Sequence, residues 1–322
     1  MPDQLEAEGR INLLNVGTKI LLKDTMDQYV RTLGDYKTFY APTMGSALRA
    51  YKENPIQLII SEIDLGDGSA YRLVQSLGGT ADDDLYVILA LEERSPILLA
   101  LAEEIEAHSI LVKPFAAADI KAQLEKYKAW RAMPKEPWRL LLREAHLAVR
   151  EKKFREAEEN FKSAIASAPT NPIALFKVGQ YYLTKPDYPV AETLLKKAVS
   201  LKPDYTRAIW ALGSLYLARH DLDKAEECFK KAHSISPLNP DRLVEMVRLY
   251  IERCVDLCKD CLRLDPAAPM ARHNLGKLFA FQKDYVATVR ELEKTLPSLQ
   301  GELKTEAQTF VALARKLGSL AK

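Results

Sequence analysis

The sequence predicts an α/β domain followed by an all-α domain: a doubly wound, five-stranded parallel sheet and then a solenoid of helical hairpins. Two patterns predict this division. Over about the first 120 residues, short apolar runs alternate with amphipathic stretches, as in sheets whose parallel strands are joined by helices. In the second half, five columns of residues recur every 34 positions. At 322 residues and 48% apolar content, the chain is long enough to bury two cores.

Five apolar runs are the predicted strands, and a stretch with helical periodicity follows each of them. The strand sequences, in order, are INLLNV, YKTFY, IQLIISE, LYVILAL and SILV. The helical stretches are one that ends near Leu33, then GSALRAYKEN, SAYRLVQSL, SPILLALAEEIEAH and AAADIKAQLEKYKAW. The runs are too short for helices and rich in Ile, Val and Leu, as expected for strands covered on both faces. Sheets of this kind place their chemistry beyond the carboxyl ends of the strands.

Residues 10 to 130 resemble the receiver domain of bacterial two-component response regulators. The resemblance rests on element order and length, on LVKPF at the end of the fifth strand (Lys113, Pro114, Phe115), and on an acidic loop after the third strand that ends in Asp67 and Gly68. It implies a flavodoxin-like sheet. It also implies phosphoryl transfer to an aspartate after strand three, with Mg²⁺ held by two acids after strand one, a hydroxyl after strand four and a lysine after strand five.

Three of these four positions lack the required residues. Glu62 stands in place of the acceptor aspartate, Asn15–Gly17 in place of the acid pair, and Leu91–Glu92 in place of the hydroxyl; only Lys113 matches. Loss of the acid pair removes tight Mg²⁺ binding, and the longer carboxylate misplaces the attacking atom. The sequence therefore predicts a pseudoreceiver, a domain that keeps the fold but cannot be phosphorylated and is retained for its surface.

Two interpretations of Glu62 remain open. Its carboxylate can reach Lys113 across the strand ends and form a permanent charge pair, or it is a solvated loop acid. Asp64 is a substitute acceptor in principle, but it lies two residues further on and shares the missing metal site. In the family, the partner-binding face is commonly helix four, strand five and helix five. The resemblance places that face at residues 95–128 of this chain.

The second half carries a 34-residue repeat that resembles the tetratricopeptide repeat (TPR). The recurring positions are Pro169, Pro203 and Pro237; Ala157, Ala191 and Ala225; Ala145, Gly179 and Gly213; Phe161, Leu195 and Phe229; and Ala164, Ala198 and Ala232. Small residues permit two helices to approach closely, large apolar residues fill the space between hairpins, and proline ends the second helix. We therefore expect a receiver-like domain at 10–130, a linker at 131–137 and a TPR-like domain at 138–322.

The fourth repeat unit departs from this pattern. Pro237 to Pro266 spans 29 residues, and DRLVEMVRLYIERCVDLCKDCLRLD contains no Gly or Pro at the expected turn. A single helix of about 24 residues and a shortened hairpin both remain open, and a hairpin that has lost its turn is slightly favoured. The fifth unit recovers the pattern from Pro269 to about Pro297, and GELKTEAQTFVALARKLGSLAK is expected to form a terminal capping helix.

The sequence shows no pattern typical of an enzyme, a metal site or a cofactor site. Cys254, Cys258 and Cys261 share one helical face but have no fourth ligand nearby, which favours core packing. The histidines at 146, 220, 233 and 273 are scattered without a metal-binding or catalytic spacing. The few cysteines, an acidic and polar start, and the lack of any apolar stretch near 18 residues favour a cytoplasmic protein without membrane insertion.

The net charge of +2 conceals two halves of opposite sign. Residues 1 to 130 hold 13 Lys+Arg and 20 Asp+Glu, net −7; subtraction from the totals of 46 and 44 leaves 33 and 24, net +9. Attraction between the halves and an acidic partner for the basic half both fit these charges. Nucleic acid is disfavoured because the basic helices also carry 24 acids and no nucleic-acid-binding motif.

By the repeat register, the first helices of the hairpins line a concave groove. Its expected residues are Arg139, Arg143, His146, Phe176, Lys177, Gln180, Trp210, Ser214, Arg248, His273, Asn274 and Lys277. Such a groove suits an acidic or amphipathic protein segment. The leading prediction is a non-catalytic bacterial signalling adaptor that binds one protein on the receiver-like face and another in the groove. The alternative is a phosphorylatable response regulator in a phosphorelay, using Asp64 or another acid.

Overall fold

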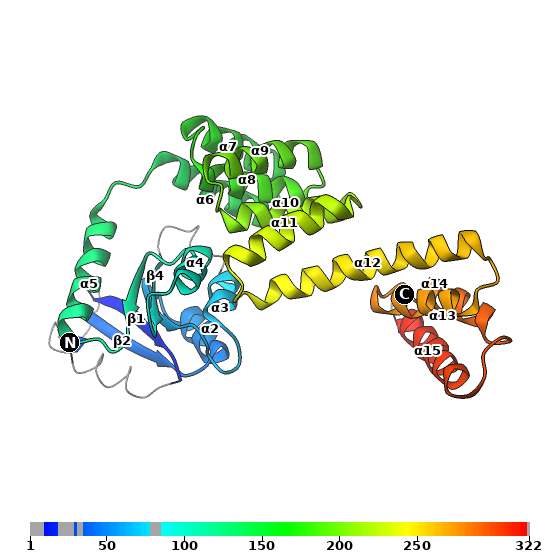
Figure 1. Cartoon of the computed structure of the whole chain (residues 1–322). Coiled ribbons are helices and arrows are strands. Elements are labelled where there is room, and N and C mark those ends of the chain that lie inside the picture. Colours follow the sequence, from blue (N-terminus) through cyan, green and yellow to red (C-terminus); the bar gives the residue numbers. More distant parts are fainter. Residues whose placement is uncertain (1–9, 19–28, 31–34, 78–84, 321–322) are drawn as a thin grey trace. The chain divides into compact units, whose positions relative to one another are not determined.

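The computed structural model describes residues 10–18, 29–30, 35–77 and 85–320, and the side chains of Pro240, Asp241 and Leu320 are not described (Figure 1). The chain divides into two compact units. The first contains residues up to Leu215 together with Cys228–Pro240, and the second contains Tyr216–Glu227 and the chain from Asp241 onward. Within the described residues, no helix combines the length and hydropathy needed to cross a membrane.

The first unit begins with a parallel sheet of five strands. These are β1 (Ile11–Val16), β2 (Tyr36–Ala41), β3 (Leu58–Glu62), β4 (Tyr86–Leu91) and β5 (Ser109–Val112), in the order β2-β1-β3-β4-β5 (Figure 1). This is the flavodoxin-like order, so the predicted fold class is confirmed. The strand order reverses between β1 and β3, the point at which sheets of this kind usually hold their ligands. The helix expected between β1 and β2 lies largely outside the described residues.

Helices cover both faces of this sheet. One face packs against α2 (Met44–Glu53), α3 (Ala70–Ser76) and α4 (Pro96–Glu104), and the other against α5 (Ala117–Ala132). Alternate residues of β3 serve the two cores: the side chain of Ile59 lies on the α2–α4 side, whereas those of Leu58 and Ile60 lie on the α5 side. Burial on both faces explains why the strands contain no polar alternation.

The repeats form helical hairpins. The helices are α6 (Pro137–Arg150), α7 (Phe154–Ser167), α8 (Pro172–Thr184), α9 (Tyr188–Leu201), α10 (Thr206–Ala218) and α11 (Leu222–Ile235). The small and large columns pack directly against each other: a Cβ on Gly213 would lie 2.5 Å from the Phe229 ring. The large column also reaches the next hairpin, since the rings of Phe161 and Tyr181 are 4.3 Å apart. Both predicted roles of these columns are confirmed.

Residues 240–264 form one uninterrupted helix, α12 (Pro240–Leu264), so the slightly favoured hairpin is wrong and the single helix is present. The cause lies in the turn. The positions seventeen residues after Pro169, Pro203, Pro237 and Pro266 are Pro186, His220, Cys254 and Lys283.

Three of these four positions have positive φ and end the first helix of their hairpin; the exception is Cys254. Each of the three is followed by an aspartate that starts the next helix, and the Asp284 side chain accepts a hydrogen bond from the backbone N–H of Ala287 at 2.9 Å. Cys254 is followed by Val255, whose side chain cannot accept such a bond. The helix therefore continues through the position at which the other repeat units form their turn.

The remaining helices of the second unit are α13 (Pro269–Phe281), α14 (Tyr285–Thr295) and α15 (Gly301–Leu320). The helix expected at the C-terminal end of the chain is therefore present as α15. It packs on the fifth repeat, where Ala307 and Val311 join Leu292 and Leu299 in one apolar cluster. An apolar inner face of this kind fits the predicted role of a cap on the array.

Candidate functional site

The strand ends bring Glu62 and Lys113 together. The register pairs Val16 with Ser61 and Glu62 with Ala90, while the Lys113 amide donates to the Leu91 carbonyl. The ends of β1, β3 and the segment after β5 therefore meet at one edge. There the Lys113 Nζ forms an ion pair with Glu62 Oε1, and the Glu62 side chain is only 7% exposed. The predicted pairing is confirmed at the level of geometry, against the alternative of a solvated acid.

The Glu62 carboxylate fills the space in front of β1. Its Oε2 accepts a hydrogen bond from the Thr18 backbone N–H at 2.9 Å. A Cβ placed on Gly17 would lie 2.6 Å from that same oxygen, so only glycine leaves room for the carboxylate. The Tyr40 hydroxyl donates to the Gly17 carbonyl at 2.7 Å; burial and the nearby Glu62 charge raise the Tyr40 pKa. The Glu62 carboxylate therefore lies between Lys113 and the end of β1.

The other two acids of the loop after β3, Asp64 and Asp67, accept hydrogen bonds from backbone N–H groups. Asp64 is exposed and accepts from the Gly66 N–H at 2.9 Å. Asp67 accepts from the N–H groups of Met44 and Gly45 at the start of α2, and the bond from Gly45 contributes most to lowering the Asp67 pKa. Asp64 therefore lies outside the Glu62–Lys113 pair. Among the described residues, no group of three or more His, Cys, Asp or Glu side chains could hold a metal ion.

A second cluster of charges lies on the array, around Lys177 of α8. The Lys177 Nζ is 3.1 Å from the Glu106 carboxylate, and Arg207 of α10 pairs with the same carboxylate. The Arg207 guanidinium also stacks over the Phe176 ring, 4.8 Å from its centroid. Burial lowers the Lys177 pKa, and the Arg207 charge acts in the same direction, whereas Glu106 opposes both. Phe176 and Lys177, two residues predicted for the groove, thus both contact this cluster.

Glu106 follows the end of α4, so the acids of this cluster come from the receiver-like half. Glu103 pairs with Lys202, and Glu104 is 4% exposed. The Glu104 carboxylate accepts from the Ser236 hydroxyl at 2.9 Å and from the Asn239 amide at 2.6 Å. We define Glu103–Glu106 as the acidic turn. Its partners come from α8, from α10 and from the segments that follow α9 and α11.

The other expected groove residues of the first unit do not join this cluster. Gln180 is exposed, and Ser214 is half-buried. Trp210 stacks on Phe229 of its own hairpin, with ring centroids 4.2 Å apart. His146 Nδ1 is 2.7 Å from the Leu142 carbonyl, and its ring meets Phe161 edge-on.

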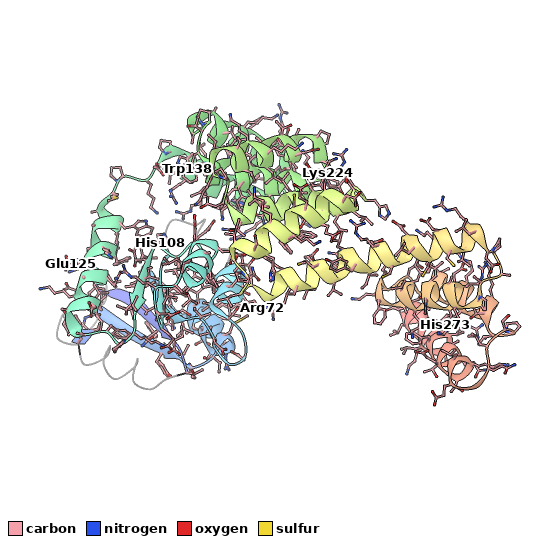
Figure 2. All side chains as sticks on the ribbon, in the orientation of Figure 1. Arg72, His108, Glu125, Trp138, Lys224 and His273 are labelled. Carbon is pink, nitrogen blue, oxygen red and sulfur yellow. The ribbon has the colours of Figure 1, made fainter. Side chains whose placement is uncertain are left out.

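At the start of the array, Arg139 pairs with Glu136 and lies over the ring of Trp138, which Figure 2 labels. Arg143 is half-buried. Trp210 and His146 thus contact residues of their own hairpins.

In the second unit the expected residues form their own set. His273 (Figure 2) is 1% exposed, and its Nε2 lies 3.3 Å from Glu306 of α15. The Lys277 Nζ donates to the same carboxylate at 2.7 Å. Asn274 is exposed, while Arg248 is exposed on α12 and pairs with Glu245 of its own helix. The Glu306 carboxylate of α15 thus already contacts both His273 and Lys277.

The cysteines of α12 lie on the surface rather than in a core. Cys254 and Cys261 are exposed, and Cys258 is half-buried. The predicted core packing of these thiols is therefore wrong, because the helix has no second half of a hairpin to cover this face. Burial raises the Cys258 pKa, and its two neighbouring thiols act in the same direction.

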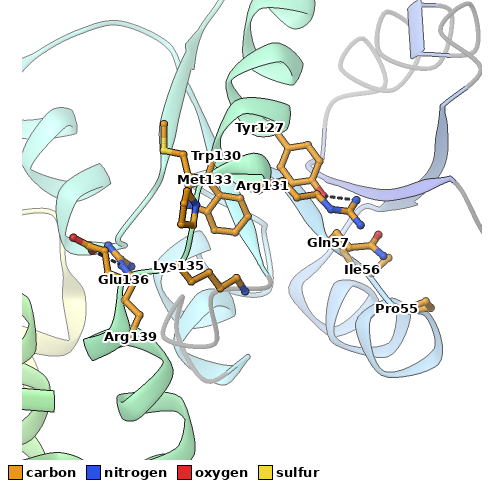
Figure 3. A pocket seen from close by; sticks show the side chains of 11 residues that line it. Pro55, Ile56, Gln57, Tyr127, Trp130, Arg131, Met133, Lys135, Glu136 and Arg139 are labelled. Atoms are coloured by element: carbon orange, nitrogen blue, oxygen red, sulfur yellow. Dashed lines mark hydrogen bonds and ion pairs between the residues drawn. The ribbon is translucent and has the colours of Figure 1, made fainter. Parts of the chain in front are cut away.

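A cavity of about 740 Å³ lies beside the segment that joins α5 to α6 (Figure 3). Tyr127, Trp130 and Arg131 of α5 contribute to its wall, together with Ile56 and the segment from Met133. Arg131 donates to the Tyr127 hydroxyl at 3.5 Å. The cavity shares no side chain with the Glu62–Lys113 pair or with the acidic turn.

The acidic turn and four of its partners, Lys202, Arg207, Ser236 and Asn239, were not predicted from the sequence. One signal was present, because AEEIE places three acids within four residues at the end of an apolar helix. The repeat register gave no help with their partners. Position 207 corresponds to Ile173 one period earlier, so the arginine is particular to one hairpin.

A model of the tetratricopeptide repeat family matches the chain at residues 142–206 and 187–240. The chain therefore carries tetratricopeptide repeats in the hairpins from α6 to α11, after a sheet with the receiver order. No curated protein sequence matches the chain.

Parts of the chain are similar to solved structures. The chemotaxis response regulator CheY4 of Vibrio cholerae is 19% identical, covering 36% of this chain and 98% of that chain, with a TM-score of 0.34. The first TPR of Spaghetti (RPAP3), bound to the HSP90 peptide SRMEEVD, is 20% identical over 37% of this chain and 94% of that chain, with a TM-score of 0.34. MamA is 18% identical over 50% and 91%, with a TM-score of 0.35.

Proposed function

We propose that this chain is a non-catalytic adaptor of the two-component signalling type, in which a pseudoreceiver is joined to a protein-binding TPR array. The observation that carries the proposal is the position of the Glu62 carboxylate. It is held by the Lys113 ammonium and the Thr18 N–H, in the space that Gly17 leaves open. The domain boundaries at 130 and 138 belong to this proposal. Its placement in the cytoplasm rests on the cysteine usage of the sequence.

Phosphoryl transfer needs a divalent cation beside the acceptor to neutralise the developing negative charge. At this edge Asn15 and Gly17 supply no carboxylate, and the lysine ammonium already neutralises Glu62. A phosphoryl group arriving here would meet an occupied lysine and no cation. The pair therefore acts as a fixed version of the contact that phosphorylation would create.

The experiment is an attempt to phosphorylate the full chain. Incubation with acetyl phosphate and Mg²⁺ should leave the intact mass unchanged, and beryllofluoride with Mg²⁺ should shift no backbone amide near residue 62. The variants Glu62→Gln and Asp64→Asn should behave like the wild type. A phosphoryl adduct that Asp64→Asn or Glu62→Gln abolishes would contradict the proposal and support the alternative of a phosphorelay protein.

The array is the part proposed to bind a protein segment that is acidic or amphipathic. Support comes from the repeat match and from the buried cations Lys177 and Arg207, which need an anionic neighbour. A second partner is proposed for the receiver-like face, where Ile97 and Leu99 of α4 are exposed. Nucleic acid is not proposed as a partner. A mobility shift of arbitrary DNA that weakens with salt would contradict this part.

A further inference from the structure

We propose that the acidic turn, Glu103–Glu106, is the resident ligand of the array, and that an acidic segment of a partner reaches Lys177 and Arg207 only by displacing it. The inference rests on the proposed function in one respect, that the array binds a protein segment. It adds the class of that segment and a competition within the chain that regulates access to it.

The cations of the array make an anionic occupant necessary. The side chains of Lys177 and Arg207 are 8% and 9% exposed, so neither is solvated by bulk water. Two buried positive charges without a counter-ion are strongly destabilising, and truncating one partner of such a group leaves the other uncompensated. Glu106 supplies the counter-ion from outside the array. A competitor must therefore bring a carboxylate of its own rather than apolar surface alone.

The backbone holds Glu106 in a defined turn at the end of α4. The Glu106 N–H bonds to the Glu103 carbonyl and the Ala107 N–H to the Ala102 carbonyl, which together form a Schellman motif at the end of α4. Glu106 occupies its left-handed position with φ at 60°, where glycine is usual because it lacks a Cβ. Lys152, His220 and Lys283 hold the same position in other turns of this chain. What is particular to Glu106 is that its carboxylate pairs with both buried cations.

The other two acids of the turn, Glu103 and Glu104, also have direct partners on the array. The Glu104 carboxylate is buried and accepts from Ser236 and Asn239, and Glu103 pairs with Lys202. Three acids within four residues thus have partners that come from four segments of the array. Recognition of this kind fits the C-terminal end of a helix with the pattern Glu-Glu-x-Glu. We infer that a displacing partner presents acids with the same helical spacing.

Displacement does not require the receiver-like core to unfold. Leu101, Ala102 and Ile105 of the same helix are held in the sheet core, independently of the array. The segment from Met133 to Glu136, which joins the two domains, is exposed throughout. Release of the turn therefore needs movement only at this segment, while α4 stays on its sheet.

The test uses hydrogen–deuterium exchange on the full chain, with each variant observed on the opposite side of the contact. Glu106→Gln should raise exchange in residues 202–209 at least tenfold, and Lys177→Met should do the same in residues 101–108. The double variant should exchange no faster than either single variant, because both remove one contact. Glu93→Gln, which changes an exposed acid just before α4, is the matched control and should leave both segments unchanged. Unchanged protection, or additive increases in the double variant, would overturn the proposal.

A second measurement tests the competition with a defined probe. A peptide of residues 95–108, labelled with a fluorophore, should bind the Glu103→Gln/Glu104→Gln/Glu106→Gln chain at least tenfold more tightly than the wild-type chain. Adding Lys177→Met should remove that gain. Equal affinities for the two chains, or no binding to either, would overturn the proposed exchange. Neither measurement involves Glu62, so a phosphoryl adduct there would defeat the proposed function and leave this result standing.

Discussion

The chain has one buried carboxylate–lysine contact at the strand ends and another on the array. Glu62 and Lys113 belong to the same domain and are positioned by neighbouring strands of one sheet. Glu106 and Lys177 belong to different domains, and their contact depends on how the acidic turn meets α8. The chemistry is the same in both. The first pair is fixed by its own fold and is permanent, whereas the second can exchange its acid for that of another protein.

The largest expected effect breaks the fixed pair. Lys113→Met should leave the buried Glu62 carboxylate without its counter-ion and destabilise the receiver-like domain by about 3 kcal/mol. Adding Glu62→Gln should recover most of this loss, because the remaining buried group is then neutral. Denaturant unfolding of the three chains, followed by circular dichroism, measures both changes. A double variant as unstable as Lys113→Met alone would show that the pair itself is not responsible.

An effect of similar size concerns pH and the side chain next to the acidic turn. His108 (Figure 2) accepts from the Val87 N–H at 3.1 Å through Nδ1 and stacks on Tyr86. Burial lowers its pKa to about 4, the Arg139 charge acts in the same direction, and Glu106 opposes them. In the unfolded chain the pKa is near 6.5, so the unfolded state binds the proton first as the pH falls.

Stability should therefore fall between pH 6.5 and 4, by about 3 kcal/mol from this group, and be fully present above pH 6.5. Urea unfolding of the wild type and His108→Gln across this range measures the contribution as a difference in slope. Glutamine can still accept from the Val87 N–H, so the fold is kept. Parallel curves for the two chains would contradict the assignment.

The smallest effect concerns the helix that presents Lys177. The Asn171 side chain caps α8 by accepting from the N–H groups of Ile173 and Ala174 at 2.9 and 3.2 Å. Asn171→Ala should cost about 1 kcal/mol, while Asn171→Asp keeps the acceptor and should cost little. If the array contact is mainly a matter of charge, exchange in residues 101–108 should stay close to wild type in both variants. A large increase in Asn171→Ala would indicate that the cap, rather than Lys177, holds the acidic turn.

The sequence predicted well those elements that follow from a local or repeated pattern of buried residues. The five strands follow from apolar runs, and the hairpins follow from a 34-residue period, because both patterns record which side chains are buried within one element or between neighbours. The uninterrupted α12 could have been predicted too. The aspartate that starts the second helix in three other units is absent after Cys254, and a capping residue is a local signal.

The candidate site residues likewise include some that the sequence predicted correctly and some that it did not. Glu62 and Lys113 could be paired from sequence because parallel strands bring their carboxyl ends to one edge whatever the rest of the chain does. Trp210 was predicted for the groove, yet its ring packs on Phe229, because the register gives a position on a helix and not the direction of a side chain. The thiols of α12 were predicted to be buried, and Cys254 and Cys261 are exposed.

The sequence by itself determined the two kinds of domain, the loss of the acid pair beside β1 and the opposite charges of the two halves. Only the tertiary structure decided that three acids at the end of α4 meet Lys177, Lys202, Arg207, Ser236 and Asn239. The physical reason is the distance along the chain over which each interaction acts. Burial periodicity and turn chemistry act over a few residues, whereas the contact between Glu106 and Lys177 joins positions 71 residues apart and depends on how two surfaces fit.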